Sequence, residues 1–184
     1  LDDTDMPESP GTGRLARDLF SLLEHRYHLL GITRHQLYVH PDIPYTSHNS
    51  AAVIHVHAVP HEERDALFEE VAQFVQSRAA KGSDPGVCMT DHESVTPALI
   101  LFGKEAKSTV LTQDQAITMA SHTGVRLIGL DGTKGGIIGS LAAVGLAAGG
   151  SDGRYIQVGK IRTLQGQAEI SAIHDAGIPA VYSL

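Results

Sequence analysis

Residues 1–24 read LDDTDMPESPGTGRLARDLFSLLE, and this stretch gives the clearest indication of the fold. An extended opening runs into three carboxylates, Asp2, Asp3 and Asp5, and the turn Gly11-Thr12-Gly13 precedes an amphipathic helix. Side chains alternate along an extended chain, so we expect Asp3 and Asp5 to share a face about 6.6 Å apart, at roughly 3.3 Å per residue, with Asp2 opposite. Carboxylate oxygens favour Mg²⁺, which keeps several waters and bridges to substrate phosphates. The opening therefore predicts a magnesium-bound phosphate site.

The composition is that of a globular protein with an acidic surface. The 184 residues are 42% hydrophobic and 19% charged, which suits one domain or two small fused lobes. A formal charge of -7 argues against a free-standing domain that holds nucleic acid by neutralising phosphates. The single cysteine, Cys88, excludes an internal disulfide and a Cys-rich zinc site, so we expect a cytoplasmic location. The longest run of small apolar residues, 135–150, is too short to span a membrane.

The hydrophobic pattern of the first half predicts a helix, two strands, a helix and a strand after the extended opening. These elements are expected at 14–29, 34–40, 51–59, after Pro60, and at 87–89. The order strand, helix, strand, strand, helix, strand is the ferredoxin-like arrangement of two split βαβ units. We therefore expect an α/β (α+β) fold whose first half, residues 1–92, is ferredoxin-like βαββαβ and carries the acidic site.

The second half, residues 93–184, predicts a second α/β lobe that is interlocked with the first. Thr96-Pro97 suits an N-cap and first helical residue, and Thr112 to Gln115 matches the capping box of a helix that ends near Gly124. A buried strand, a turn and a glycine-rich helix opening at Gly135-Gly136 follow. A strand, a helix and a last strand are then expected at 155–158, 170–176 and 180–183.

Two segments combine an aspartate at a strand end, a glycine turn and the start of a helix. They are 2–13 and 131–136, and such places in α/β sheets bind anions at unpaired helix amides. Gly11, Gly13, Gly135 and Gly136 are thus candidate phosphate-binding residues. The alternatives stay open that Thr12 only caps the first helix and that the glycines only allow close packing. The GxxxxGK[ST] motif is absent.

The connection between the two predicted strands is rigid and polar. It reads PDIPYTSHNS over 41–50, which suits a binding loop and equally a hairpin stiffened by two prolines. Tyr45 and Asn49 are its candidate ligand-facing residues. In the following strand, His55 and His57 share a face and could bind a transition metal, but no third ligand can be named, so a polar strand surface is the better interpretation.

Several separated segments together resemble one family, the archaeal 2-agmatinylcytidine synthetases that modify an isoleucine tRNA. The matching segments are DDTD at 2–5, PxIPY at 41–45 followed by Asn49 and Ala52-Val53, DPGV at 84–87, and GGIIGSLAAVG at 135–145. They occur in the family's order and at similar spacing. The resemblance covers the family's N-terminal half, a kinase-like and a ferredoxin-like domain that bind ATP with Mg²⁺ and agmatine.

The resemblance implies roles for the acidic opening. By position, Asp2, Asp3 and Asp5 match the family's metal-binding carboxylates, and Thr12 falls where the family has a threonine that can accept a phosphoryl group. The family's paired threonines are replaced by Gly11-Thr12-Gly13, and its KTRGNGAV-like loop reads TSHNSAAV at 46–53, without the Lys and Arg. The expectation is a stand-alone protein that lacks the family's OB-fold and zinc ribbon and does not bind tRNA directly.

These observations predict a Mg²⁺-dependent, ATP-binding enzyme of the phosphoryl-transfer or ATP-dependent ligase type, acting on a small molecule such as an amine. Asp3, Asp5 and Thr12 would carry the chemistry. Two alternatives stay open, a non-catalytic protein that binds a small ligand or nucleotide, and a tRNA-modification subunit whose partner supplies RNA binding. No membrane association is expected, and the apolar helices of the second half could form a homodimer face.

Overall fold

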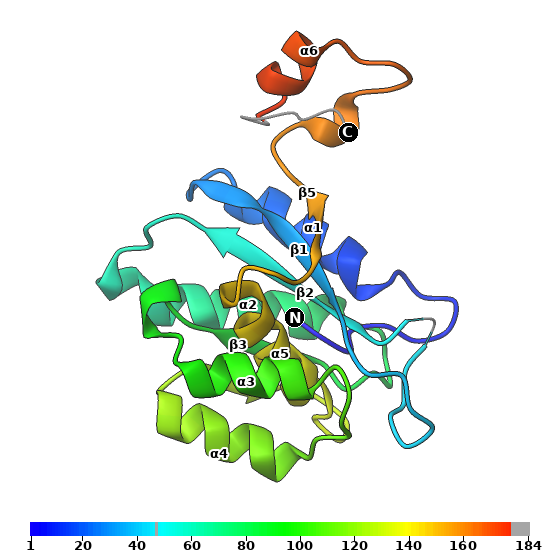
Figure 1. Ribbon diagram of the computed structural model, residues 1–184, viewed down its shortest axis with the longest axis vertical. Coiled ribbons are helices and arrows are strands. Elements are labelled where there is room, and N and C mark those ends of the chain that lie inside the picture. The colour runs from blue at the N-terminus through cyan, green and yellow to red at the C-terminus, as the bar shows by residue number, and fades with distance from the viewer. Residues whose placement is uncertain (47, 178–184) are drawn as a thin grey trace.

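The computed structural model describes residues 1–46 and 48–177, and it has the mixed α+β fold that the sequence predicts (Figure 1). The helices are α1 Thr12–Leu23, α2 Arg64–Arg78, α3 Pro97–Glu105, α4 Gln113–Thr123, α5 Gly136–Ala148 and α6 Ile170–Asp175. The strands are β1 Leu29–Gln36, β2 Ser50–Val56, β3 Gly86–Met89, β4 Arg126–Gly129 and β5 Arg154–Gln157. No helix in the described ranges has the length and apolar character needed to cross a bilayer.

The first two residues join two antiparallel sheets. One sheet has the order β2, β1, β5, and the other consists of β3 and β4. Leu1 exchanges two backbone hydrogen bonds with Ala52 of β2, at 2.8 and 2.9 Å, and Asp2 exchanges two with Gly86 of β3, both at 3.1 Å. The order across the fold is therefore β4, β3, the opening residues, β2, β1, β5. Its four inner segments have the predicted ferredoxin-like order.

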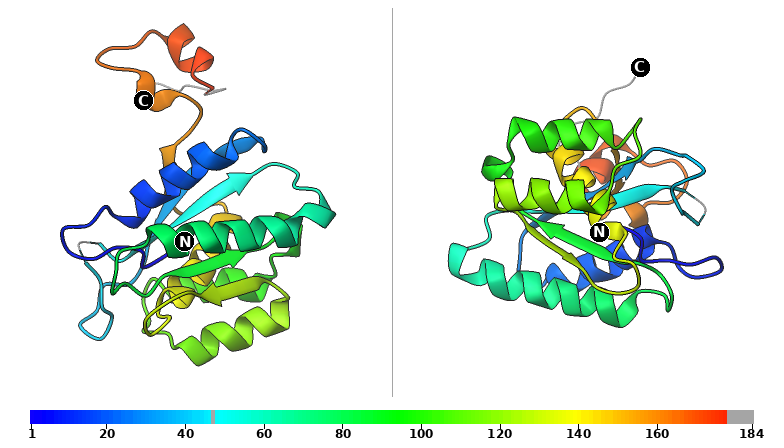
Figure 2. Two further views of the ribbon diagram at one scale, coloured as in Figure 1. Left: turned by 180° about the vertical axis from the view of Figure 1, so that it is seen from behind. Right: turned by 90° about the horizontal axis from the view of Figure 1, so that it is seen from below.

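Helices cover both sides of these strands. In the view from below in Figure 2, α1 and α2 lie on one side, and α5, with α3 and α4 outside it, lies on the other. Each side has its own apolar core. The core on the α1 side includes Leu15, Leu19, Phe20, Ile32 and Val75, and the core on the α5 side includes Leu99, Phe102, Ala116, Leu141 and Leu146.

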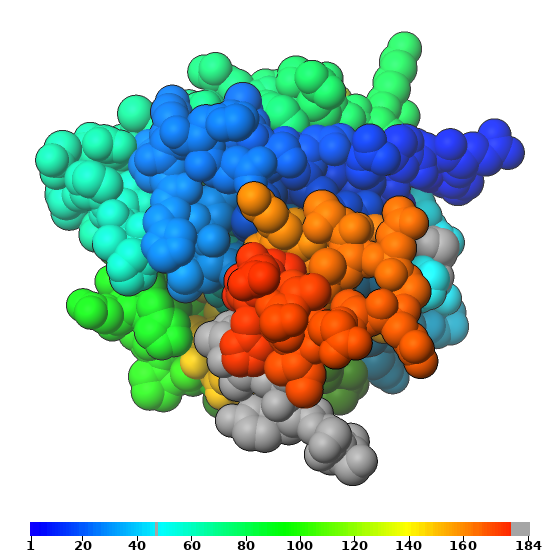
Figure 3. Space-filling view, turned by 90° about the horizontal axis from the view of Figure 1, so that it is seen from above, coloured from blue at the N-terminus to red at the C-terminus, as the bar shows by residue number. Residues whose placement is uncertain are grey.

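Residues 158–177, which carry α6, extend away from the helix and strand layers at one end of the molecule (Figure 1). In the view from above they lie in front of the rest of the molecule (Figure 3). Because β5 pairs with β1, residues from the second half of the chain extend the sheet of the first half. The division into lobes 1–92 and 93–184 stays a prediction. The strand expected at 180–183 lies outside the described residues.

Local sequence signals set several helix ends as predicted. The Thr96 hydroxyl accepts a hydrogen bond from the Leu99 amide at 3.3 Å, with proline as the first residue of α3. Thr112 and Gln115 form both bonds of the capping box of α4. Gly124, with φ of 69°, ends that helix in the left-handed conformation that glycine adopts without strain.

Two elements in the first half differ most from expectation, and the strand predicted at 51–59 also ends earlier, at Val56. β1 covers Leu29–Gln36, so the strand predicted at 34–40 is displaced, because Thr33 and His35 are buried and their polar side chains conceal the inward face. Helix α1 ends at Leu23, before the expected end at 29. Thr12 is its first helical residue and Gly11 its N-cap, so the prediction that Thr12 caps the helix is wrong.

Helix α5 touches its neighbours through glycines. A Cβ atom on Gly136 would lie 2.5 Å from the Gly86 nitrogen, and one on Gly139 would lie 1.9 Å from Asp2 Oδ2. A Cβ on Gly145 would lie 2.1 Å from the Leu99 carbonyl oxygen of α3. These separations are far below van der Waals contact, so α5 can occupy this position only with glycine at these sites.

We expect Gly145→Ala to lower the free energy of unfolding by about 1–3 kcal/mol, because the added methyl group must push α3 and α5 apart. Urea denaturation of the two proteins measures the difference. Gly149→Ala is the matched control, since a Cβ there would have its nearest neighbours at 3.4 Å and the backbone is already helical. Equal destabilisation by both substitutions would contradict the packing argument.

Candidate functional site

A cavity of about 260 Å³ opens where the acidic opening, α5 and the 41–50 loop meet. Seven of the ten predicted site residues line it, namely Asp2, Asp3, Asp5, Thr12, Tyr45, Asn49 and Gly135. Asp42 adds a fourth carboxylate, and no lysine or arginine of the described part of the chain is among the lining residues. We call this the acidic cavity.

The three remaining candidates lie elsewhere. Gly136 packs against the backbone of Gly86, as the packing alternative expects. Gly11 and Gly13 line a neighbouring cavity at the start of α1. Gly135 lines the acidic cavity without a close contact, since the atom nearest to a Cβ on it would be Thr133 Oγ1 at 3.5 Å.

The three aspartates do not alternate along one strand. Only Asp2 has strand pairing, and Asp3 has a φ of 51°, in the left-handed region that is uncommon for residues other than glycine. The chain therefore turns at Asp3, and the expectation that Asp3 and Asp5 share one strand face is wrong. A backbone conformation of this kind costs on the order of 1–3 kcal/mol and concentrates at functional sites.

The hydroxyl of Thr12 is held in a buried hydrogen-bond cluster. It donates to Asp5 Oδ1 at 3.0 Å and accepts from the Thr4 hydroxyl at 3.0 Å. The other Asp5 oxygen accepts from the Thr46 hydroxyl at 2.6 Å. The Thr12 amide also lies 3.4 Å from Asp5 Oδ1, so this carboxylate caps the first turn of α1 in place of a local side chain.

Burial and like charge make two of the carboxyl groups weak acids. Burial, followed by the negative charge of Asp3, raises the pKa of Asp2 to about 7. Burial, followed by the charges of Asp84 and Asp5, raises the pKa of Asp3 to about 6. Ionised together, these groups repel one another, and a bound cation would relieve that repulsion.

Asp84, considered above only within the DPGV segment at 84–87, adds negative charge beside Asp3. Its carboxylate accepts hydrogen bonds from the Thr133 amide at 2.5 Å and the Thr133 hydroxyl at 2.8 Å. The turn that contains it leads into β3, whose first residue, Gly86, pairs with Asp2. Its place in the DPGV segment, two residues before β3, was the signal that could have identified it.

The aspartates of the acidic cavity could hold a magnesium ion only if water and substrate oxygens completed its coordination shell. Within 1–46 and 48–177, no three aspartate, glutamate, histidine or cysteine side chains are grouped as ligands for one metal ion. Mg²⁺ needs no such cage, because it commonly takes one or two carboxylates and completes its shell with water and phosphate oxygens. The assignment of Asp2, Asp3 and Asp5 to a metal stays a prediction.

Tyr45 and Asn49 of the 41–50 loop differ in how accessible their side chains are to a ligand. Tyr45 is 45% exposed at the mouth of the acidic cavity. The Asn49 side chain donates to the Tyr38 carbonyl at 2.6 Å, and its backbone carbonyl accepts from the Leu37 amide at 2.8 Å, so it closes the base of the loop. A ligand would meet Tyr45 more readily than the Asn49 amide nitrogen.

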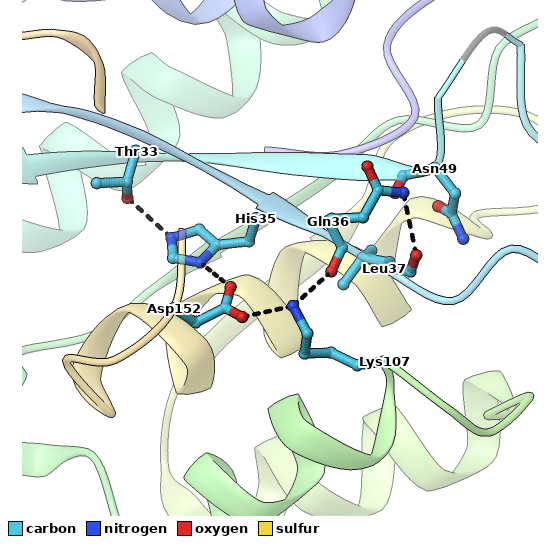
Figure 4. Close-up of polar contacts among 7 residues, drawn as sticks. All are labelled: Thr33, His35, Gln36, Leu37, Asn49, Lys107 and Asp152. Carbon is cyan, nitrogen blue, oxygen red and sulfur yellow. Dashed lines mark hydrogen bonds and ion pairs between the residues drawn. The ribbon is translucent and has the colours of Figure 1, made fainter. Parts of the chain in front are cut away.

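A second polar network lies inside the fold, away from this cavity. His35 is buried, with Nδ1 2.9 Å from Asp152 Oδ1 and Nε2 2.8 Å from the Thr33 hydroxyl (Figure 4). Thr33 also lies 2.7 Å from His55 Nε2, and Lys107 pairs with Asp152. Because a carboxylate only accepts hydrogen bonds, His35 Nδ1 carries a proton.

This network explains the histidines of the 51–59 region without a metal. His55 is committed to Thr33, whereas the exposed His57 contacts the ring of His28 with centroids 5.4 Å apart. The network attaches the segment before β5 to β1. Sequence reasoning missed it because Asp152 and Lys107 reach His35 only through the tertiary fold.

We expect Asp2→Asn to change how stability depends on pH. A carboxyl with a folded pKa of about 7, above its ordinary 3.8, favours the fold at low pH, and this contribution is lost as pH rises from about 4 through about 7. The melting temperature of the variant minus that of the wild type should therefore be larger at pH 8 than at pH 5. Each kcal/mol of free energy of unfolding corresponds to about 2–4 °C in melting temperature.

Thermal unfolding by circular dichroism at several pH values measures this difference. Asp114→Asn, on the exposed face of α4, is the matched control for losing one negative charge. A constant difference between Asp2→Asn and the wild type from pH 5 to 8 would show that Asp2 is not the weak acid described.

Crystal structures of TiaS, an agmatidine synthetase for an isoleucine tRNA, share this fold. Apo TiaS is 26% identical with a TM-score of 0.64, and the complex of TiaS with that tRNA and ATP is 27% identical with a TM-score of 0.67. The complex of TiaS with the tRNA, AMPCPP and agmatine is 25% identical with a TM-score of 0.63. In each case the match covers 78% of this chain and 34% of the TiaS chain.

No protein-family model and no curated protein matches the sequence. The similarity to TiaS is present in the sequence as well as in the fold, since about a quarter of the aligned residues are identical. The chain spans about a third of the length of the TiaS chains, which fits an N-terminal half. The similarity to that half of the isoleucine-tRNA agmatinylcytidine synthetases, predicted from the sequence motifs, is therefore confirmed.

Proposed function

We propose that this protein is a Mg²⁺-dependent, ATP-binding enzyme of the phosphoryl-transfer or ligase type that acts on a small molecule. One observation carries the proposal: a cavity that joins clustered carboxylates to a buried threonine hydroxyl lies in a fold shared with TiaS. Solved TiaS complexes contain ATP, or AMPCPP with agmatine. This agreement of local chemistry with overall fold supports nucleotide binding.

The charge of the acidic cavity supports a metal ion between protein and phosphate. Phosphate would be repelled by four aspartates unless a cation lay between them. Asp3 is the best placed ligand, since Asp5 already accepts bonds from Thr12 and Thr46 and Asp2 is packed against Gly139 of α5. A bound Mg²⁺ would neutralise charge on the transferring phosphate.

The hydrogen bonds of the Thr12 hydroxyl support a role as acceptor of a phosphoryl group. In the proposed step, Thr12 Oγ1 attacks the terminal phosphorus of ATP and the bond to the bridging oxygen breaks, so that ADP leaves. The proton of the hydroxyl passes to Asp5 Oδ1, which already accepts its hydrogen bond at 3.0 Å. A small substrate could then receive the phosphoryl group from Thr12.

The same charge pattern supports a basic substrate. The acidic cavity offers carboxylates and the exposed ring of Tyr45, which together suit an amine or guanidinium group. TiaS in complex with AMPCPP and agmatine is a neighbour in fold that holds such a molecule. We therefore propose a small amine as the substrate class.

We expect Asp3→Asn to abolish the Mg²⁺-dependent part of ATP binding, because it removes the charge that would hold the metal. Asparagine suits this test since it tolerates the positive φ of residue 3 better than alanine does. Isothermal titration with ATP, with and without Mg²⁺, measures the effect. The control is Asp114→Asn, and equal Mg²⁺-dependent affinity in Asp3→Asn and the wild type would defeat the metal assignment.

We expect the wild type, incubated with ATP and Mg²⁺, to become phosphorylated on the peptide that contains Thr12. Thr12→Val should lose this modification, Thr12→Ser should keep it, and Asp5→Asn should slow it by about 100-fold or more, in the range of a lost general base. Mass spectrometry of the digested protein identifies the site. A wild type that consumes ATP yet carries no phosphate on Thr12 would exclude the covalent step and leave direct transfer.

A further inference from the structure

A second cavity adjoins the acidic one and has the opposite charge. It measures about 270 Å³ and is lined by three arginines, Arg14, Arg17 and Arg34, and by the first turn of α1. Four residues line both cavities and form the wall between them, namely Asp5, Thr12, His48 and Ser50. We call this neighbour the arginine cavity.

Arg17 has positive charge without a matching anion. Its guanidinium Nη1 lies 3.8 Å from the Cβ position of Gly13, beside the first turn of α1. Among the described residues it makes no ion pair, whereas Arg14 is paired with Asp18 at 3.0 Å. Burial, followed by the charges of Arg162 and Arg14, lowers the pKa of Arg17, which reflects the same crowding of cations.

Arg34 approaches from the sheet. It lies in β1, and its Nε donates to the Ser50 hydroxyl at 2.8 Å, which fixes the guanidinium plane. This is the only bond that Arg34 makes with another described side chain, so its terminal nitrogens can meet an anion. A planar guanidinium matches two oxygens of a phosphate at once.

The start of α1 adds to the positive potential at this place. The helix runs over Thr12–Leu23, where the Thr12 amide bonds to Asp5 Oδ1 and the Arg14 amide to the Gly11 carbonyl oxygen. Within the described part of the chain, this leaves the Gly13 amide of the first turn without a partner. The partial positive charge of a helix N-terminus favours phosphate groups. Two half-buried arginines from separate elements converge on that terminus, which a packing role alone does not require.

We infer that the arginine cavity binds the phosphate chain of a nucleoside triphosphate, with Arg17 and Arg34 as its charge partners. The inference rests on the proposed function and names the side from which phosphate reaches the site. Phosphate would approach the Thr12 hydroxyl from the arginine cavity, while the cation and the basic substrate occupy the acidic one. Arginines of α1 and β1 would supply the positive charge that the 46–53 loop does not.

The test is isothermal titration of Arg17→Gln, Arg34→Gln and the wild type with three probes, MgATP, inorganic triphosphate and adenosine. Because each variant loses one charged hydrogen-bond partner, its affinity for MgATP and for triphosphate should fall by at least about tenfold. Its affinity for adenosine should not change. Arg78→Gln is the matched control, because Arg78 is exposed at the end of α2 and lines neither cavity. Arg34→Lys keeps a positive charge at this position of β1. It provides a second test of Arg34 if Arg34→Gln does not fold.

The probes separate this inference from the proposed function. The wild type could bind triphosphate through Arg17 and Arg34 without binding MgATP more tightly than triphosphate. That result would support the anion site and contradict the proposed nucleotide-binding enzyme. If MgATP binds and neither arginine variant weakens it relative to Arg78→Gln, the phosphate lies elsewhere and the inference is overturned. Failure of the folded wild type to bind triphosphate also overturns it.

Discussion

The contact on which the site depends is the one between the backbones of Gly86 and Gly136. A Cβ on Gly86 would lie 2.1 Å from the carbonyl carbon of Gly136, so the start of α5 rests directly on the strand that pairs with Asp2. This contact brings the 131–135 turn to the acidic opening, although the two are far apart in the chain. Gly139, one turn further, faces the Asp2 carboxylate and keeps it buried.

Placing carboxylates at this contact has an electrostatic consequence. Burial raises the pKa of both Asp2 and Asp3, and neighbouring carboxylates add to it, Asp3 acting on Asp2, and Asp84 and Asp5 acting on Asp3. The left-handed backbone of Asp3 adds strain to the same short segment. Charge repulsion and backbone strain therefore occur together at the acidic cavity, and the proposed cation would remove the repulsion.

The sequence predicted what local patterns and strand order determine, and missed what depends on distant segments. The capping box at Thr112 and the left-handed Gly124 follow from their own neighbours, and the ferredoxin-like order follows from the sequence of elements. The turn at Asp3 and the partnership of Asp84 with Thr133 depend on how α5 meets the opening strand. Burial of His35 likewise needs Asp152, so alternation placed β1 too late in the chain.

Thr12 lies where the two kinds of charge meet, and this position follows from its place as the first residue of α1. The helix N-terminus and Arg17 lie on one side of it, and the carboxylates lie on the other. A phosphate and a cationic group held by these two sides would be drawn toward the same hydroxyl, each by charge of opposite sign. Asp5 holds that hydroxyl by accepting its hydrogen bond, so in the proposed phosphoryl transfer the residue that orients Thr12 would also take its proton.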